Sequence, residues 1–422
     1  MMEKHNLVIV GGGPAGLAAA ISAYDMGETD IIILERESKL GGILNQCIHN
    51  GFGLHTFNEE LTGPEYAQRF IDEVNKRNIK YLLDTTVINI TNDKHIKALS
   101  TSGLYNIEAK AIILSCGCRE RPRGAINIAG SRASGIYSAG TAQKLVNIDG
   151  YMPGKEVVIL GSGDIGLIMA RRMIFEGAKV KAVIELMPYS SGLNRNIVQC
   201  LNDFNIPLLF SHTVIDIKGK NRVESVVIAE VDEKLNPKLE TKQEIKCDTL
   251  LLSVGLLPEN ELARGADVNL SRITRGAIVD DNLMTNIEGI FECGNVLHVH
   301  DLVDYVCEEA KEAGIKAYEY INNKDINNYS KTEIICENGV RYTVPELIIK
   351  NNDNIPLTLK LRVGNVYKKV KLEVKCDDEI IYSRLRPVVA PGEMEKLDLK
   401  PDQVLKLRNA NTIKVYLRSI EE

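Results

Sequence analysis

Short runs of apolar residues recur along the chain at the length of buried strands. They occupy residues 7–10, 111–114, 157–160 and 250–254. Each run lacks polar alternation, which is typical of parallel strands covered on both faces, and each is far too short to span a membrane. Helical patterns follow some of these runs, notably near residues 64–76 and 302–322. The alternation of strands and helices predicts an α/β fold.

The pattern changes after residue 322. Residues 322–328 are polar and rich in Asn, which predicts a linker. Beyond it, apolar and polar residues alternate over 358–363, 370–374 and 413–417, with a turn at Pro391-Gly392. A period of two indicates antiparallel strands with one buried face, so we expect a small β-sandwich-like domain. It shows no catalytic constellation, and either docking to a partner or plain stabilisation would explain it.

Two glycine-rich turns stand directly after apolar runs. The first reads Gly11-Gly12-Gly13-Pro14-Ala15-Gly16, the second reads Gly161-Ser162-Gly163-Asp164-Ile165-Gly166, and an acid follows each at the same spacing, Glu35 and Glu185. In such a unit the first glycine permits a tight turn, the second admits a pyrophosphate, and the third lets helix and strand pack closely. The helix N-terminus favours the phosphates, and the carboxylate can accept hydrogen bonds from a ribose diol. The repeated spacing predicts two bound dinucleotides.

The second unit interrupts the first. A short strand near residues 289–293 leads into Gly294-Asn295 and a long helix, with no sheet of its own to join. These elements must therefore complete the earlier sheet. We predict two Rossmann-like, three-layer dinucleotide-binding domains, the second inserted in the first, and a C-terminal antiparallel β domain. The expected boundaries are 1–125 with 262–325, then 126–261, then 331–422.

Composition narrows the class of protein. The net charge of −6 and the pI of about 5.8 give no reason to expect a nucleic-acid partner. Nine cysteines without a Cys-x-x-Cys pair argue against a disulfide framework and favour a reducing cytoplasm. The same absence excludes the usual spacing of iron-sulfur, zinc and thioredoxin-like dithiol sites, so we expect no metal.

The order of these elements resembles the pyridine nucleotide-disulphide oxidoreductases, flavoproteins with two dinucleotide-binding domains. The resemblance covers about residues 5–325 and implies FAD at the first turn, NAD(P)H at the second, and hydride transfer between them. It places the following residues at FAD: Gly11, Gly13, Pro14, Ala15, Gly16, Glu35, Arg36, Gly42, Ile43, Gln46, Val87, Cys116, Gly117, Gly294, Asn295, Asp301 and Leu302. It places these at the nicotinamide dinucleotide: Gly161, Gly163, Asp164, Ile165, Gly166, Glu185 and Gly255. Asn295 stands where the family has Asp, and an amide can still bond a ribitol hydroxyl.

Three segments, residues 41–53, 117–121 and 294–304, are similar to a narrower bacterial branch of this family. Its members resemble the flavin subunits of amine and opine oxidases. They are often encoded beside a glycerol-3-phosphate dehydrogenase flavoprotein and a small Cys-rich protein. The resemblance implies an oligomeric electron-transfer subunit that works with a partner dehydrogenase and a small-molecule redox substrate.

The acid of the second turn favours NAD(H) over NADP(H). Glu185 would repel a 2′-phosphate and can bond a free ribose diol. The next residues, Leu186-Met187-Pro188, contain no cation that would attract that phosphate. An exposed carboxylate at a strand end is the alternative interpretation.

Cys47, His49 and His300 are the candidate catalytic residues. His49 and His300 lie in the two segments expected near the flavin, where a histidine could donate a proton near working pH. Backbone bonding by these histidines, with Asp301 as a helix cap, is the alternative. The resemblance also bears on Cys47, because disulfide reductases carry two cysteines in this loop and this chain carries one. Cys47 could be a thiolate nucleophile activated by His49, or a thiol that packs near the flavin.

Three functions therefore remain open. The first is an FAD subunit that exchanges hydride with NAD(H) and passes electrons to or from a partner. The second is a stand-alone NADH oxidase or thiol-dependent reductase using Cys47. The third is a mainly structural subunit of a dehydrogenase complex.

Overall fold

The computed structural model describes residues 2–322, 329–351 and 353–420. The predicted linker therefore lies mostly outside the described residues. The chain divides into two compact units, one formed by Met1–Cys118 with Pro258–Glu422 and the other by Arg119–Leu257. The second unit is thus an insertion in the first. Among the described residues, no helix is long and apolar enough to cross a membrane.

The first unit is built on a seven-stranded sheet. The strand order is β5-β2-β1-β8-β7-β6, with β19 also paired to β8. The bounds are β1 (Met2–Val10), β2 (Ile31–Leu34), β5 (Lys80–Leu82), β6 (Thr85–Ile90), β7 (His95–Ser100), β8 (Gly103–Leu114) and β19 (Ile290–Glu292). Strand β8 pairs antiparallel with β7 and parallel with β1 and β19. The parallel pair β8–β19 confirms that a downstream strand completes the first sheet.

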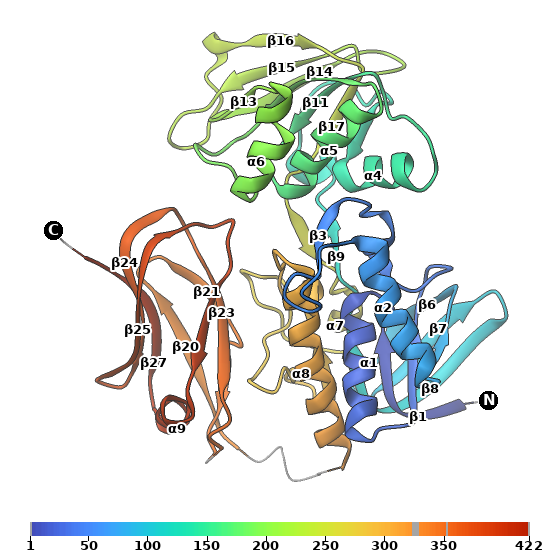
Figure 1. Ribbon diagram of the computed structural model, residues 1–422, viewed down its shortest axis with the longest axis vertical. Coiled ribbons are helices and arrows are strands. Elements are labelled where there is room, and N and C mark those ends of the chain that lie inside the picture. The colour runs from blue at the N-terminus through green and yellow to red at the C-terminus, as the bar shows by residue number, and fades with distance from the viewer. Residues whose placement is uncertain (1, 323–328, 352, 421–422) are drawn as a thin grey trace. The chain divides into compact units, whose positions relative to one another are not determined.

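Helices α1 (Pro14–Met26) and α8 (Val303–Asn322) lie side by side on this sheet (Figure 1). Residues 17–20 of α1 are fully buried and three of them are Ala, so a second helix can approach closely. Gly314 of α8 completes that fit, because a Cβ there would lie 2.2 Å from the Ala19 carbonyl oxygen. The contact holds α8, and the turn before it, against the first glycine-rich turn.

The remaining elements of this part of the chain are short, apart from α2. They are η1 (Gly42–Gln46), β3 (Asn50–Phe52), β4 (Leu61–Thr62), α2 (Gly63–Lys76), α7 (Glu261–Gly265) and η4 (Gly294–Val296). A capping box starts α2, in which the Glu65 side chain accepts the Thr62 N–H at 2.8 Å and Thr62 accepts the Glu65 N–H.

The inserted unit contains a parallel sheet of order β10-β17-β11-β12-β13 and an antiparallel sheet of order β14-β15-β16. Its strands are β10 (Ile136–Ser138), β11 (Glu156–Leu160), β12 (Lys179–Ile184), β13 (Leu208–Leu209), β14 (His212–Lys218), β15 (Ser225–Glu230), β16 (Gln243–Lys246) and β17 (Thr249–Leu252). Its helices are α3 (Arg123–Ile126), α4 (Ala139–Asn147), α5 (Asp164–Phe175), α6 (Asn194–Cys200), η2 (Asn202–Phe204) and η3 (Leu239–Thr241). Strands β9 (Cys118–Glu120) and β18 (Leu256–Pro258) lie where the chain enters and leaves the inserted unit.

Strand β11 shows why its sequence is an unbroken apolar run. Val157 and Ile159 belong to one hydrophobic core, whereas Val158 and Leu160 belong to another. Both faces of the strand are covered, so neither set of alternating positions can be polar.

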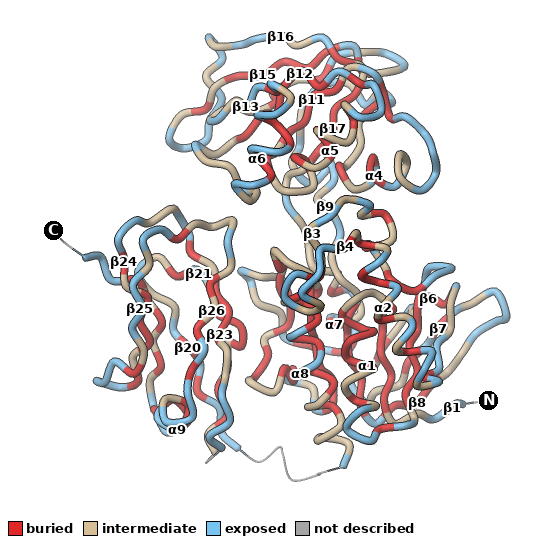
Figure 2. Tube along the Cα trace, in the orientation of Figure 1, coloured by how far each residue is buried: buried red, intermediate tan, exposed pale blue. Residues whose placement is uncertain are grey.

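The C-terminal region forms two sheets around its own core. Their orders are β22-β20-β27-β24-β25 and β21-β23-β26. The bounds are β20 (Lys331–Glu337), β21 (Val340–Val344), β22 (Leu347–Ile349), β23 (Leu357–Val363), β24 (Tyr367–Cys376), β25 (Glu379–Val389), β26 (Glu395–Leu399), α9 (Pro401–Asn409) and β27 (Ile413–Ser419). The sequence pattern does not predict α9 or the parallel pairing of β20 with β27. Figure 2 shows buried positions on both sheets of this region.

This architecture confirms the predicted fold class. Two Rossmann-like units and a C-terminal domain of mostly antiparallel strands are present.

Candidate functional site

The first glycine-rich turn joins β1 to α1. Gly11 has φ of 108°, a conformation that favours glycine, and Pro14 opens the helix. A Cβ at Gly16 would lie 1.9 Å from the Gly11 carbonyl oxygen, so residue 16 must be glycine for helix and strand to pack. Gly13 instead faces open space, since a Cβ there would lie 3.9 Å from the nearest atom, Gly42 Cα.

Glu35, directly after β2, stabilises this turn. Its carboxylate is buried, Oε2 accepts the Gly12 N–H at 2.6 Å, and Oε1 accepts the Glu37 N–H at 2.8 Å. An ionised carboxylate has about four acceptor positions, so two remain for ribose hydroxyls.

The second turn, between β11 and α5, repeats this geometry. Glu185 Oε2 accepts the Ser162 N–H at 2.9 Å, and Oε1 accepts the Met187 N–H at 2.9 Å. The Ser162 hydroxyl adds a bond to Oε2 at 2.5 Å. Glu185 is therefore a buried part of the turn, unlike the exposed carboxylate of the alternative interpretation.

The helix after the second turn begins differently from α1. Asp164 stands where the first turn has Pro14, and its Oδ1 accepts the Leu193 N–H at 2.8 Å and the Asn196 amide at 2.6 Å. Gly161 and Gly255 both have positive φ, and Gly255 O accepts the Arg121 N–H at 3.0 Å. Gly163 precedes the helix as its cap, and Ile165 and Gly166 lie in its first turn.

Two serines that follow the neighbouring strands secure the turns, and the sequence interpretation missed both as site residues. Ser115 Oγ donates to the carbonyls of Val10 and Gly11, at 2.9 and 3.0 Å. In the inserted unit, Ser253 Oγ accepts the Gly166 N–H at 3.1 Å. Their positions in the sequence could have revealed them. Each serine directly follows a strand, β8 or β17, that pairs with the strand before a glycine-rich turn.

Gly294 and Asn295 close the first turn from far downstream. Gly294 has φ of 75°, and a Cβ there would lie 3.0 Å from Ala15 Cβ. Asn295 Oδ1 accepts the His300 N–H at 3.0 Å, and its Nδ2 lies 3.7 Å from Cys118 Sγ. The amide thus shapes the loop that leads into α8, which begins directly after Leu302.

Other predicted FAD residues surround the same turn or lie in segments that lead away from it. Gly42 packs on the first turn, since its Cβ would lie 3.0 Å from Gly13 Cα. Cys116 Sγ lies 3.6 Å from the Val10 carbonyl, and burial raises the pKa of its thiol to about 12. The rest are placed as follows: Arg36 exposed after β2, Ile43 exposed and Gln46 buried in η1, Val87 half-buried in β6, and Gly117 at positive φ.

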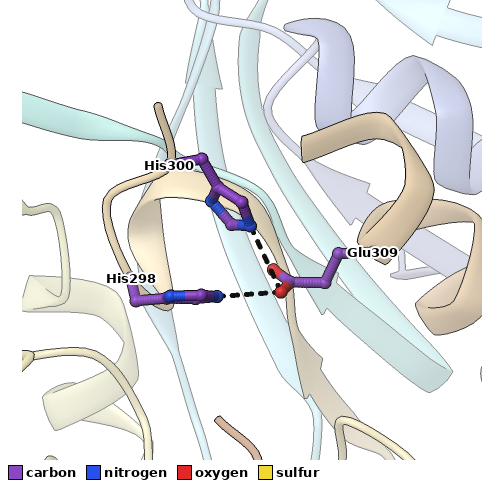
Figure 3. A group of neighbouring side chains, drawn as sticks. All are labelled: His298, His300 and Glu309. Atoms are coloured by element: carbon purple, nitrogen blue, oxygen red, sulfur yellow. Dashed lines mark hydrogen bonds and ion pairs between the residues drawn. The ribbon is translucent and has the colours of Figure 1, made fainter. Parts of the chain in front are cut away.

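The three candidate catalytic residues lie in three different environments. Cys47 Sγ lies 3.3 Å from the Ile43 carbonyl, and burial raises the pKa of its thiol to about 12. His49 stacks on Phe52 with ring centroids 5.0 Å apart. His300 is buried in a cluster with His298 and Glu309 (Figure 3).

Glu309 of α8 is the centre of that cluster. Its Oε2 lies 2.9 Å from His298 Nε2 and 3.3 Å from His300 Nε2, and its Oε1 accepts the Gly294 N–H at 2.8 Å. Burial lowers the pKa of His298 to about 4, so this imidazole is neutral at physiological pH. Asp301 bonds Arg362 of β23 and accepts the Met394 N–H at 2.7 Å, so its carboxylate faces the C-terminal domain.

Residues 5–317 match the family model of the pyridine nucleotide-disulphide oxidoreductases. The chain belongs to this family. Membership makes it a flavin-dependent NAD(P)H oxidoreductase, which confirms the class expected from the paired turns.

Relatives of this oxidoreductase include reductases and components of larger enzymes. Thioredoxin reductase of Peptoclostridium acidaminophilum is 25% identical over 329 residues, 76% of this chain and 98% of that protein. Hydrogen cyanide synthase subunit HcnB of Pseudomonas protegens is 25% identical over 325 residues, 70% of this chain and 64% of that protein. An opine oxidase subunit of Agrobacterium tumefaciens is 24% identical over 296 residues, 64% of this chain and 56% of that protein. The chain thus spans less than two thirds of the length of each of these two enzyme subunits.

The crystal structure of thioredoxin reductase from T. acidophilum has the same fold. It matches with a TM-score of 0.62 and 23% identity, over 75% of this chain and 99% of that one.

The first turn of this oxidoreductase fits the adenosine and pyrophosphate parts of FAD, the family's flavin. Gly13 leaves free space at the N-terminus of α1, where a phosphate would approach. Glu35 keeps acceptor positions for a ribose diol.

Proposed function

We propose that the chain exchanges a hydride between NAD(H) and FAD and passes electrons to or from a partner flavoprotein dehydrogenase that oxidises a small polar metabolite. The observation that carries the proposal is the repeated carboxylate geometry. Glu35 and Glu185 each bond the N–H of the second residue of their turn and the N–H two residues beyond themselves. One chain therefore offers two matched dinucleotide sites, one in each unit.

NAD(H) is the dinucleotide we infer for the second turn. The Glu185 carboxylate is held against Ser162, where a 2′-phosphate would meet a negative charge. Residues 186–188 offer no cation to offset it.

The protein's contribution to catalysis is binding and electrostatics. Bound FAD supplies the hydride-accepting chemistry. The first turn of α8, after Leu302, has the positive end of the helix dipole, which would stabilise negative charge on a reduced flavin.

A partner is proposed for three reasons. The relatives include proteins named as subunits of hydrogen cyanide synthase and opine oxidase. The loop at Cys47 contains one cysteine, and the raised pKa of that thiol disfavours a thiolate. The C-terminal domain adds a surface that a partner or a second copy could use.

A glycerol-3-phosphate dehydrogenase flavoprotein and a Cys-rich protein are the partners we propose to test first. We also propose a cytoplasmic location. The nine cysteines all lie in the described part of the chain and form no disulfide there, which suits a reducing compartment.

Adding NADH without oxygen to the FAD-loaded chain is expected to bleach the flavin, and NADPH is expected to do so more slowly. The measurement is the visible flavin absorbance in a stopped-flow instrument. Gly163→Ala is the matched test variant, because its Cβ would occupy the approach to α5, and its nearest neighbour would be Ser253 Oγ at 3.2 Å. It should keep FAD and lose at least about tenfold in the rate of reduction. If NADH leaves the wild-type flavin oxidised, the NAD assignment fails and a structural role becomes the better interpretation.

Replacing Cys47 by Ser is expected to leave NADH oxidation by oxygen or peroxide within about twofold of wild type. The reason is that a thiol with a raised pKa is a poor nucleophile at working pH. The check is steady-state turnover with each acceptor, with Cys47→Ala as a second variant. A large loss in both variants would favour the stand-alone, thiol-dependent reductase instead.

A further inference from the structure

The Glu309 carboxylate joins the C-terminal domain to the turn that closes the first dinucleotide site. Glu309 is fully buried in α8. Its Oε1 accepts the Gly294 N–H at 2.8 Å, and its Oε2 lies 2.9 Å from Nζ of Lys360, a residue of β23. One oxygen of the carboxylate therefore bonds the turn at Gly294, and the other oxygen bonds the C-terminal domain.

Two buried histidines share the Glu309 carboxylate with Lys360. The Nε2 atoms of His298 and His300 and the Nζ of Lys360 all converge on one atom, Glu309 Oε2, at 2.9, 3.3 and 2.9 Å. Lys360 Nζ, which is protonated and cannot bind a metal, thus occupies a place beside the same carboxylate oxygen as the two imidazoles. The ammonium group already supplies the positive charge that a metal would bring.

The alternation of β23 explains how a lysine comes to be buried here. Leu359 and Leu361 point into the core of the C-terminal domain, so Lys360 points to the opposite face. That face lies against α8, and Lys360 is only 4% exposed. An ammonium in such a place costs several kcal/mol unless it is paired.

Both Glu309 and Lys360 are ionised. Burial would raise the pKa of Glu309, but Lys360 and the two histidines hold it well below its usual range. Burial would lower the pKa of Lys360, but Glu309 and then Glu312 raise it. An ionised Glu309 makes the stronger, charge-assisted bond to the Gly294 N–H.

A second contact from the same strand acts on the same loop. Arg362, two residues beyond Lys360, donates to the Val299 carbonyl at 3.0 Å and pairs with Asp301. The outer face of β23 thus contacts this segment directly near α8, and reaches its Gly294 end through Glu309.

We propose that Lys360 is a positioning residue of the flavin site, which keeps Glu309 ionised and oriented so that Glu309 fixes the Gly294 turn. The C-terminal domain then contributes to FAD binding. This inference rests on FAD binding at the first turn, and it is distinct from the hydride exchange with NAD(H).

The test is Lys360→Met in the full chain, stripped of flavin and titrated with FAD while flavin fluorescence is followed. The Kd for FAD should rise at least tenfold, and the visible spectrum of the bound flavin should change. Lys360→Arg, which restores a cation, should recover most of the affinity. Unfolding of the flavin-free variants is measured in parallel, so that loss of stability and loss of affinity are separated.

Lys396→Met is the matched control. Lys396 lies on β26 of the same domain. It pairs with Glu308, the neighbour of Glu309, and the Glu308 side chain is half-exposed. The substitution removes a more exposed ion pair between β26 and α8, and the contact of Lys396 Nζ with the Tyr305 ring, while leaving the Glu309–Gly294 bond in place. We expect less than a twofold change in FAD affinity.

Two results would overturn the proposal. One is wild-type FAD affinity in Lys360→Met, and the other is an equal loss in both lysine variants, which would show that domain docking alone matters. If Lys360→Met does not fold, the neutral pair Glu309→Gln with Lys360→Met replaces it, since no buried charge is left unpaired. Weakened FAD binding in that folded double variant supports the proposal, and unchanged binding refutes it. A failure of FAD binding in the wild type would instead refute the assignment on which the inference rests.

Discussion

Two alanine substitutions in the first turn are expected to weaken FAD binding, one by destabilising the fold and the other by blocking the approach of the pyrophosphate. Gly16→Ala places a methyl group 1.9 Å from the Gly11 carbonyl oxygen and 2.8 Å from Ser115 Oγ. Because Gly11 O is backbone and its strand is buried on both faces, the turn must shift. We expect a loss of about 3 kcal/mol or more in the free energy of unfolding, at the upper end for overpacking.

Gly13→Ala should leave the flavin-free protein as stable as the wild type. Its backbone is extended, with φ of −77°, and the nearest atom to the new methyl group lies at 3.9 Å. The methyl group would, however, fill the space through which a pyrophosphate reaches the helix N-terminus. The Kd for FAD should rise by at least about tenfold, or 1.4 kcal/mol.

Denaturant unfolding of the flavin-free proteins and FAD titrations distinguish the two variants. Gly124→Ala serves as control, because a Cβ there meets nothing within 4 Å. Normal FAD affinity in Gly13→Ala would show that the flavin does not use this turn.

Raising the pH from 6 to 9 is expected to destabilise the protein through two buried carboxyl groups. Burial raises the pKa of Glu292 to about 8, and Glu346 and Glu309 add to the effect. Burial likewise raises the pKa of Glu346 to about 8, with a further contribution from Glu333. Each group accepts one backbone N–H, from Ala277 and Val279 respectively, and each leaves its Oε1 atom buried without a hydrogen-bond partner among the described residues.

The direction follows from proton binding. The folded protein retains these protons up to about pH 8, whereas the unfolded chain loses them near pH 4.5. The stability they contribute is therefore complete below pH 4.5 and disappears as the pH rises through 8. Between pH 6 and the folded pKa of about 8, at about 1.4 kcal/mol per pH unit, each group costs on the order of 3 kcal/mol of stability.

Glu292→Gln and Glu346→Gln should each flatten this dependence. The measurement is the thermal midpoint between pH 6 and pH 9, with Glu393→Gln, at an exposed position, as control. Equal falls in the midpoint for the wild type and both variants would contradict the assignment.

The sequence predicted the parts of the site that depend on local geometry. A glycine that must allow close packing, such as Gly16, and an acid at a fixed spacing, such as Glu35, are properties of one strand-turn-helix unit. The closure by Gly294 was also predictable, because a strand and helix without a sheet must join an earlier one. The parallel pairing of β19 with β8 confirms that reasoning.

The contacts that the sequence did not reveal are between distant residues. The alternation around Lys360 predicts a strand and its two faces, but it cannot tell that the polar face meets α8 rather than water. Glu309 likewise looks like an ordinary surface position of a helix until Lys360 is placed opposite it. Asp301 could be taken as a helix cap, whereas its carboxylate pairs with Arg362.

The buried pair of Lys360 and Glu309 limits how domains of this kind can be exchanged. A chimera carrying the C-terminal domain of another protein would need a cation opposite position 309, or a neutral residue at that position. Without either change, the graft would leave the buried Glu309 carboxylate without a cation next to the Gly294 turn. Where this domain is exchanged within the family, Lys360 and Glu309 should therefore be kept together or lost together.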